Sequence, residues 1–208
     1  MGNTVVIKPA PQDPLAIIKL GEVLNEVFPP GVVNVIVGSS PEVGAALVDS
    51  KDVNMISFTG SSQVGAKIME AGGKTMKRLL MELGGKGALI MTEDCDVQAA
   101  VGGIASVWGF HSGQICTAPT RVICHREIYE PTIEALTAVS EFMTLGDARE
   151  ESTLVGPVIT ETHRDRIEAF IQSGINDGAE VIVGGDRPQR DGFFIAPTLL
   201  AGCTPEMH

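Results

Sequence analysis

Apolar and polar positions follow two alternating patterns over the first eighty or so residues. Short β-branched, apolar runs predict strands, and the longer stretches between them have apolar residues at helical spacing. The predicted order is strand 4–7, helix 13–27, strand 32–37, helix 41–50, strand 53–58, helix 61–71 and strand 78–83. These strands are too apolar to leave either face in water. The pattern therefore predicts a mostly parallel sheet covered by helices, an α/β fold.

Glycines interrupt this pattern at Gly84-Gly85-Lys86-Gly87, and we interpret them as a domain junction. Beyond the junction the pattern predicts strand 88–91, helix 96–107, strand 121–124, helix 129–142, helix 161–172, strand 180–183 and a turn-rich tail from residue 184. The expected organisation is thus two domains, residues 1–83 and residues 84–208. Asp13 before Pro14 predicts an N-cap and first-turn pair for the first helix.

Composition and charge exclude some classes of protein. The chain is 44% hydrophobic and 20% charged, which is typical of a globular protein. The formal net charge of −11 argues against a nucleic-acid surface, which needs clustered Lys and Arg. No apolar run reaches the roughly 18 residues of a membrane span, and the N-terminus lacks the features of a signal peptide. A cytoplasmic protein without membrane or nucleic-acid partners is expected.

Cysteines and histidines give no pattern of metal ligands. The four cysteines form no C-x-x-C pair, and the four histidines are scattered without ligand spacing. The sequence therefore predicts free thiols in a reducing compartment and no metal site.

The turn after the strand at 53–58 is a candidate phosphate site. Gly60 and Gly65 lie between a strand and a helix that Ser61 or Ser62 would cap. A helix N-terminus offers unpaired N–H groups and the positive end of the helix dipole, and glycine allows close approach. The spacing is not G-x-G-x-x-G, so an ordinary capped turn remains the alternative.

Cys116 is the candidate nucleophile among the four cysteines. It follows a Gly113-Gln114 turn and precedes small residues, which would leave its sulfur accessible. The alternative is a small buried hydrophobe, the role that we expect for Cys124. His111 lies five residues earlier, but no orienting Asn or Asp favours a Cys–His pair of the hydrolase type.

Glu82 is the candidate general base. It ends an apolar strand just before two glycines. A carboxylate in apolar surroundings can take a proton near neutral pH, whereas the alternative is a solvated strand end.

Five motifs, in order, resemble the aldehyde dehydrogenase superfamily: NTVVIKP, FPPGVVNVIVG, ISFTGSSQVG, MELGGK and GQIC. The resemblance extends over nearly the whole chain. It implies a Rossmann-like parallel sheet, the later part of a dinucleotide-binding domain, followed by an α/β catalytic domain. It also implies an NAD(P)⁺-dependent oxidoreductase acting on a small-molecule aldehyde.

The same resemblance implies a role for each matching residue. Cys116 matches the nucleophile, whose backbone N–H would help to hold the oxyanion, and Glu82 matches the base that activates water. Lys8 matches the lysine at the adenine-side ribose. The turn beside the pyrophosphate is matched by Gly60, Ser61 and Gly65, and the backbone near the nicotinamide by Leu83 and Gly84. The implied chemistry passes through a thiohemiacetal and a thioester on Cys116.

The chain departs from the family pattern at the adenine-side ribose and in its length. Pro11 stands where a carboxylate would hold the ribose hydroxyls, which leaves NADP⁺ open, although no nearby basic cluster favours it over NAD⁺. Family members extend further on both sides, so we expect a truncated chain that is inactive alone and a full-length protein that forms a homo-oligomer.

Two alternatives and one substrate prediction accompany this interpretation. An inactive fragment or non-catalytic nucleotide-binding module would retain the same motifs. A coenzyme A-acylating enzyme is disfavoured by Glu82, because that branch typically lacks this base. Trp108, Phe110, Ile115 and Thr117 are the predicted substrate contacts and indicate an apolar or aromatic aldehyde.

Overall fold

The structure is a computed structural model that describes residues 2–207. The chain divides into two compact units, with the division between Leu83 and Gly84. Unit 1 is the part up to Leu83, and unit 2 is the part from Gly84 onward.

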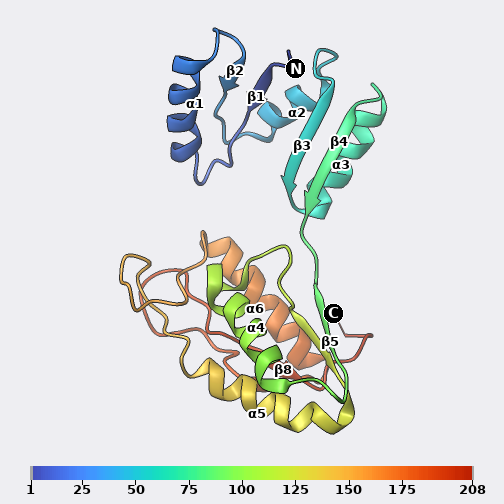
Figure 1. Cartoon of the computed structure of the whole chain (residues 1–208), viewed down its shortest axis with the longest axis vertical. Helices are drawn as coiled ribbons and strands as arrows, with labels where there is room; N and C mark the ends of the chain where they lie inside the picture. The colour runs from blue at the N-terminus through green and yellow to red at the C-terminus, as the bar shows by residue number, and fades with distance from the viewer. Residues whose placement is uncertain (1, 208) are drawn as a thin grey trace. The chain divides into compact units, whose positions relative to one another are not determined.

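Unit 1 alternates strands and helices in the predicted order (Figure 1). Its elements are β1 (Val5–Ile7), α1 (Leu15–Val27), β2 (Val33–Val35), α2 (Pro41–Asp49), β3 (Met55–Gly60), α3 (Ser62–Gly73) and β4 (Arg78–Leu83). The strands form two parallel pairs, β1 with β2 and β3 with β4, and no ladder between these pairs is found within residues 2–207. The single continuous sheet expected for unit 1 is thus incomplete. The three-residue strands β1 and β2 offer few backbone groups for further pairing.

Helix starts in unit 1 follow local capping chemistry, with one exception. The Ser61 hydroxyl accepts the Val64 N–H at 3.3 Å and fixes the start of α3, as predicted. The prediction that Asp13 caps α1 is wrong. Pro14 is the N-cap and has a helical backbone, while the Asp13 N–H donates to the Ala10 carbonyl in a turn of its own.

Close packing in unit 1 depends on one glycine and one buried lysine. A Cβ added at Gly65 would lie 2.7 Å from Leu83 Cδ2, so α3 can approach β4 only because this side chain is absent. Lys77 is buried, and its ammonium donates to the Ser50 and Val53 carbonyls at 2.5 and 2.7 Å. This lysine joins the end of α2 and the segment before β3 to the start of β4.

Unit 2 has helices beside two further strand pairs. Its elements are β5 (Ala88–Met91), α4 (Val97–Gly109), the 3₁₀ turn η1 (Phe110–Gly113), β6 (Arg121–Cys124), the 3₁₀ turn η2 (Arg126–Ile128), α5 (Tyr129–Ser140), α6 (Glu161–Asn176), β7 (Glu180–Val183) and β8 (Leu199–Ala201). The β5–β6 pair is parallel and the β7–β8 pair antiparallel. β8 was not predicted. The α/β fold class is confirmed.

The core of unit 2 forms where α4 and α5 pack together. Val101, Ile104 and Leu136 are nearly inaccessible to solvent, and Trp108 packs against them. At the start of α4 the Asp96 carboxylate accepts the Ala99 N–H at 3.0 Å, which confirms the predicted helix start. This core supports the C-terminal end of α4, from which the Cys116 segment departs.

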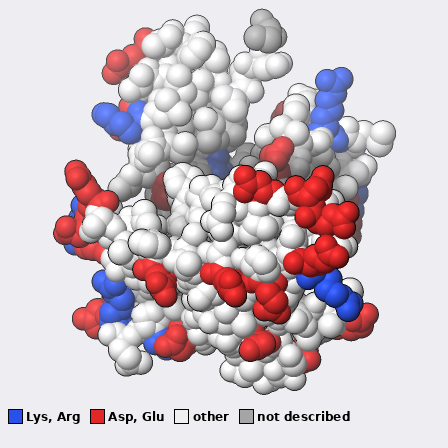
Figure 2. Space-filling model, turned by 60° about the horizontal axis from the view of Figure 1, so that its bottom comes forward, with Lys and Arg blue, Asp and Glu red and all other residues white. Residues whose placement is uncertain are grey.

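The surface is predominantly acidic. Figure 2 shows carboxylate side chains spread over the face in view, with fewer Lys and Arg among them, as the net charge of −11 requires. Among the helices of residues 2–207, none has both the length and the apolar composition to cross a membrane.

Candidate functional site

The segment before Cys116 has an uncommon left-handed backbone. After α4, His111, Ser112 and Gly113 have φ values of +48°, +56° and +72°. Left-handed conformation costs roughly 1–2 kcal/mol for each residue that has a Cβ, so His111 and Ser112 together store about 2–4 kcal/mol. Such strain persists only where surrounding contacts hold it. We call residues 110–118 the nucleophile loop.

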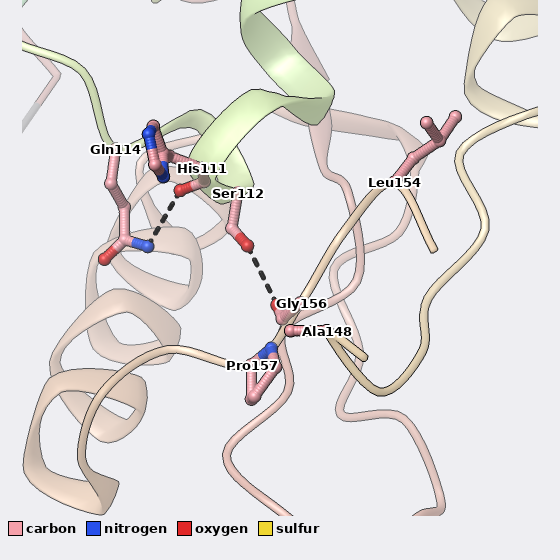
Figure 3. A pocket seen from close by; sticks show the side chains of 7 residues that line it. All are labelled: His111, Ser112, Gln114, Ala148, Leu154, Gly156 and Pro157. Atoms are coloured by element: carbon pink, nitrogen blue, oxygen red, sulfur yellow. Dashed lines mark hydrogen bonds between the residues drawn. The ribbon is translucent and has the colours of Figure 1, made fainter. Parts of the chain in front are cut away.

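Contacts within unit 2 hold this strained turn in place. The Gln114 backbone N–H and side-chain amide both donate to the His111 carbonyl, at 3.1 and 3.0 Å. The Ser112 hydroxyl donates to the Gly156 carbonyl at 2.8 Å, and Figure 3 shows both side-chain contacts. The turn is therefore joined to a segment more than forty residues further along the chain.

Gln114 also contacts the first turn of α6. Its side-chain oxygen lies 3.0 Å from His163 Nε2. Sequence reasoning missed both the His163 contact and the Ser112 contact, because partners 49 and 44 residues apart leave no local pattern.

Cys116 presents an exposed, free thiol in the turn that follows. The Ala118 N–H donates to the Ile115 carbonyl at 3.0 Å, whereas the Cys116 N–H makes no hydrogen bond to any residue in 2–207. Cys203 is exposed as well, and Cys95 is half-buried. Burial raises the pKa of the Cys124 thiol, which agrees with a packing role for that residue. Cys116 thus combines an accessible sulfur with a backbone donor at the same residue.

The far end of the nucleophile loop packs on the glycine-rich junction. A Cβ at Gly87 would lie 2.3 Å from the Ala118 carbonyl oxygen, so only glycine fits there. The Lys86 ammonium donates to the Thr120 carbonyl at 3.1 Å, and Arg121 donates back to the Lys86 carbonyl at 3.1 Å. Partial desolvation, and to a lesser degree the charge of Arg121, lowers the pKa of Lys86. The loop is therefore fixed at both ends.

An open hollow of about 600 Å³ lies beside the loop (Figure 3). It is lined by loop residues and by the facing segment 148–157, namely His111, Ser112, Gln114, Ala148, Leu154, Gly156 and Pro157. None of the four predicted substrate contacts, Trp108, Phe110, Ile115 and Thr117, lines this hollow. Trp108 instead packs against the core of unit 2, and Phe110 is 60% exposed.

Glu82 lies near the carboxyl end of β4 in unit 1, opposite Thr59 of β3. Figure 1 shows these two parallel strands side by side. The Glu82 side chain is exposed in this chain, which agrees with the solvated strand end and not with apolar surroundings. Leu83 is half-buried against Gly65, and Gly84 has no atom within 4 Å of an added Cβ.

The other predicted cofactor residues also lie at strand ends. Lys8 directly follows β1 and is half-buried, with its ammonium 2.8 Å from the Pro9 carbonyl. Gly60 is the last residue of β3, and Ser61 caps α3. The first N–H groups of α3 have no partner within the helix, which suits a pyrophosphate. Ligands of open α/β sheets bind at these carboxyl ends.

Three exposed side chains form an additional cluster that the sequence did not predict. One ligand atom each from Glu93, His125 and Glu127 lies within 4.8 Å of the others. The Glu127 N–H donates to His125 Nδ1 at 3.4 Å, which places the proton of the neutral ring on Nε2. Nε2 lies 3.9 Å from the Glu93 carboxylate. This distance is too long for a hydrogen bond, and only the spacing of the three side chains resembles a metal site.

Comparison with known proteins gives consistent results along the whole chain. The model of the aldehyde dehydrogenase family matches residues 1–208. A phenylacetaldehyde dehydrogenase from Pseudomonas fluorescens is 40% identical over 202 residues, which are 96% of this chain and 40% of that protein. A betaine aldehyde dehydrogenase from Bacillus subtilis is 36% identical over 212 residues, spanning all of this chain and 43% of that protein.

Solved structures give the same result. The crystal structure of betaine aldehyde dehydrogenase from Staphylococcus aureus in complex with NAD⁺ has a TM-score of 0.92 at 35% identity, covering 98% of this chain and 42% of that one. An NAD-dependent aldehyde dehydrogenase from Sinorhizobium meliloti has a TM-score of 0.93 at 38% identity, with 98% and 41% covered. The chain spans about two fifths of the length of these relatives. By its sequence and its fold, this chain belongs to the aldehyde dehydrogenase family.

Proposed function

We propose that this chain provides the nucleophile and the water-activating carboxylate of an enzyme that oxidises an aldehyde to a carboxylic acid with NAD⁺. The observation that carries the proposal is the state of Cys116, which has an exposed thiol and an unpaired backbone N–H in a loop fixed at both ends. In this proposal residues 1–83 belong to the cofactor domain and residues 84–208 to the catalytic domain.

Cys116 performs the covalent steps. Its thiolate sulfur bonds to the aldehyde carbon, and the carbonyl oxygen becomes the oxyanion of a thiohemiacetal. The unpaired Cys116 N–H donates to that oxyanion, where a pre-positioned donor is most effective. Loss of hydride from the same carbon converts the thiohemiacetal into a thioester. NAD⁺, when bound, accepts this hydride.

Glu82 completes the reaction by general base catalysis. Its carboxylate takes a proton from a water molecule as the oxygen of that water attacks the thioester carbon. The carbon–sulfur bond breaks, the carboxylic acid leaves, and the thiol of Cys116 is regenerated. The solvent-exposed carboxylate of Glu82 is accessible to water for this step.

Unit 1 has groups that fit the cofactor. Ser61 and the first N–H groups of α3 would hold the pyrophosphate, with Gly60 permitting close approach, and Lys8 would hold the adenine-side ribose. Leu83 and Gly84 would line the nicotinamide end. The solved Staphylococcus aureus relative is an NAD⁺ complex, which supports NAD⁺ as a cofactor.

Mass analysis of the folded chain tests this proposal. A truncated chain that does not turn over can still form the covalent adduct, so after incubation with phenylacetaldehyde and NAD⁺ we expect an acyl group on the peptide that contains Cys116. Glu82→Gln should accumulate more of this adduct because hydrolysis slows, and Cys116→Ser should show none. A folded chain that acquires no adduct, or acquires it equally at Cys203, would refute the assignment. Faster loss of the adduct with coenzyme A than with water would indicate the acylating reaction instead.

A further inference from the structure

The nucleophile loop reaches α6 through one side chain, Gln114. The start of α6 is capped by Thr160, whose hydroxyl accepts the His163 N–H at 3.2 Å. His163 therefore occupies the first turn of the helix with its backbone donor already satisfied. Its imidazole is half-buried and contacts the Gln114 side chain, with Nε2 at 3.0 Å from Oε1.

The hydrogen bonds assign a direction to this contact. The Gln114 amide nitrogen donates to the His111 carbonyl at 3.0 Å, so the oxygen of the same amide faces His163 as an acceptor. His163 Nε2 must then carry a hydrogen and donate.

We propose that His163 is a positioning residue that holds the nucleophile loop through Gln114. The donation from His163 fixes the Gln114 side chain, and that side chain in turn fixes the carbonyl of His111, the first left-handed residue. Cys116 follows two residues after Gln114, so the direction of its thiol and of its free N–H depends on this chain of contacts. The consequence for catalysis rests on the function proposed for Cys116, whereas the effect on the loop does not.

Hydrogen exchange of the intact 208-residue chain tests the effect on the loop. In His163→Ala and in Gln114→Met we expect exchange of peptides covering 111–118 to accelerate about 3- to 10-fold, the range for loss of one hydrogen bond. The double variant should exchange no faster than Gln114→Met alone, because that variant already removes the contact with His163. His163→Gln restores an N–H donor and should return exchange toward the original rate.

Two controls separate positioning from a general loss of structure. His125→Ala removes an exposed imidazole elsewhere in unit 2 and should leave exchange of the loop unchanged. Exchange of α6 from residue 165 onward should be unaltered in every variant. The proposal is overturned if His163→Ala leaves the loop unchanged, if it destabilises α6 equally, or if the two single effects add. Should His163→Ala not fold, His163→Phe, which keeps an aromatic ring and lacks the donor, decides the same question.

The rate of adduct formation at Cys116 separates this proposal from the proposed function. With saturating aldehyde and NAD⁺, His163→Ala should slow the adduct about 3- to 10-fold and leave the half-saturating aldehyde concentration unaltered. If no variant acquires an adduct while exchange responds as expected, the function of Cys116 fails and the role of His163 in the loop stands. If His163→Ala forms the adduct at the normal rate and its loop exchange is unaltered, the function of Cys116 stands and the role of His163 in the loop fails.

Discussion

Unit 1 and unit 2 differ in how completely they bury their apolar side chains. Within residues 2–207, unit 1 has three buried hydrophobic residues, Val33, Val48 and Ile68, whereas unit 2 has eleven. Unit 1 nevertheless exposes more of its large apolar side chains, among them Leu15 at 78% and Val27 at 71%. The two units have similar alternating patterns of apolar and polar residues. The pattern therefore identifies the faces that can be buried, but it does not show what covers them.

The exposed area of the whole chain agrees with this incomplete burial. The accessible surface is 14205 Å². A compact protein of 21.9 kDa would expose about 9,300 Å², and two separate compact bodies of this combined mass about 11,000 Å². Because unit 2 has the larger core, we expect it to be the more stable unit. Four substitutions test this comparison, from the largest expected effect to the smallest.

Leu136→Ala should give the largest loss. Leu136 is 2% exposed in the core of unit 2, and truncation of such a leucine costs about 2–5 kcal/mol of the free energy of unfolding. Leu154→Ala in the same unit, where the side chain is 55% exposed, is the matched control and should cost far less. Urea unfolding followed by the fluorescence of Trp108, which packs on this core, measures the effect. Equal losses in the two variants would contradict the assignment of the core.

Gly87→Ala should destabilise unit 2 by about 1–3 kcal/mol, because the new Cβ would meet a backbone carbonyl 2.3 Å away. Backbone cannot rotate aside as the end of a side chain can. Gly85→Ala, where no atom lies within 4 Å, is the control and should be nearly neutral. Unfolding curves followed by Trp108 fluorescence measure both variants. An unchanged free energy of unfolding in Gly87→Ala would show that the backbone of the junction can shift at little cost.

Lys77→Met tests the packing of unit 1. The substitution keeps the length of the side chain and removes the donor to the Ser50 and Val53 carbonyls, at an expected cost of about 1–2 kcal/mol. Hydrogen exchange of peptides from α2 and β3 should accelerate, while unit 2 stays unchanged. Lys74→Met removes the same charge from an exposed position and should have no such effect. Acceleration throughout the chain would argue against independent units.

Arg187→Gln should have the smallest effect, and that effect should depend on pH. The hydrogen bond from Arg187 lowers the pKa of Glu168 below its ordinary value of 4.5. The stabilisation is therefore complete above that value and is lost as the pH falls through the lowered pKa. The unfolding difference from the original chain should be present at about pH 7 and shrink in acid. Arg166 lies on the same helix as Glu168 and has no carboxylate partner among the described residues. Arg166→Gln should therefore show no such trend.

Most elements could be predicted from the sequence because their own residues determine them. The runs at 78–83, 88–91 and 121–124 agree with β4, β5 and β6 at both ends. β8 was missed because three apolar residues in a turn-rich tail become a strand only by pairing with β7, nearly twenty residues earlier. Asp13 was assigned as a cap from residue type alone, although its N–H belongs to the preceding turn.

The candidate site could be predicted only as far as motifs reach. Cys116 and Glu82 were singled out by the sequences around them. The support of the loop depends on Ser112 meeting Gly156 and on Gln114 meeting His163, and neither contact has a signature in the chain. The left-handed backbone of His111 and Ser112 could not be predicted either, because neither residue is a glycine. Only Gly113, which follows them, is of a type that favours a positive φ.

The junction between the units has consequences for protein engineering. Gly84 and Gly85 stand in open space, whereas Lys86 and Gly87 are fastened to residues 118–121. Extra residues or a reporter peptide inserted between Gly84 and Gly85 should leave the thiol of Cys116 where it is. The same insertion between Lys86 and Gly87 would move the segment that supports the nucleophile, so a permissive position and a damaging one lie only two peptide bonds apart.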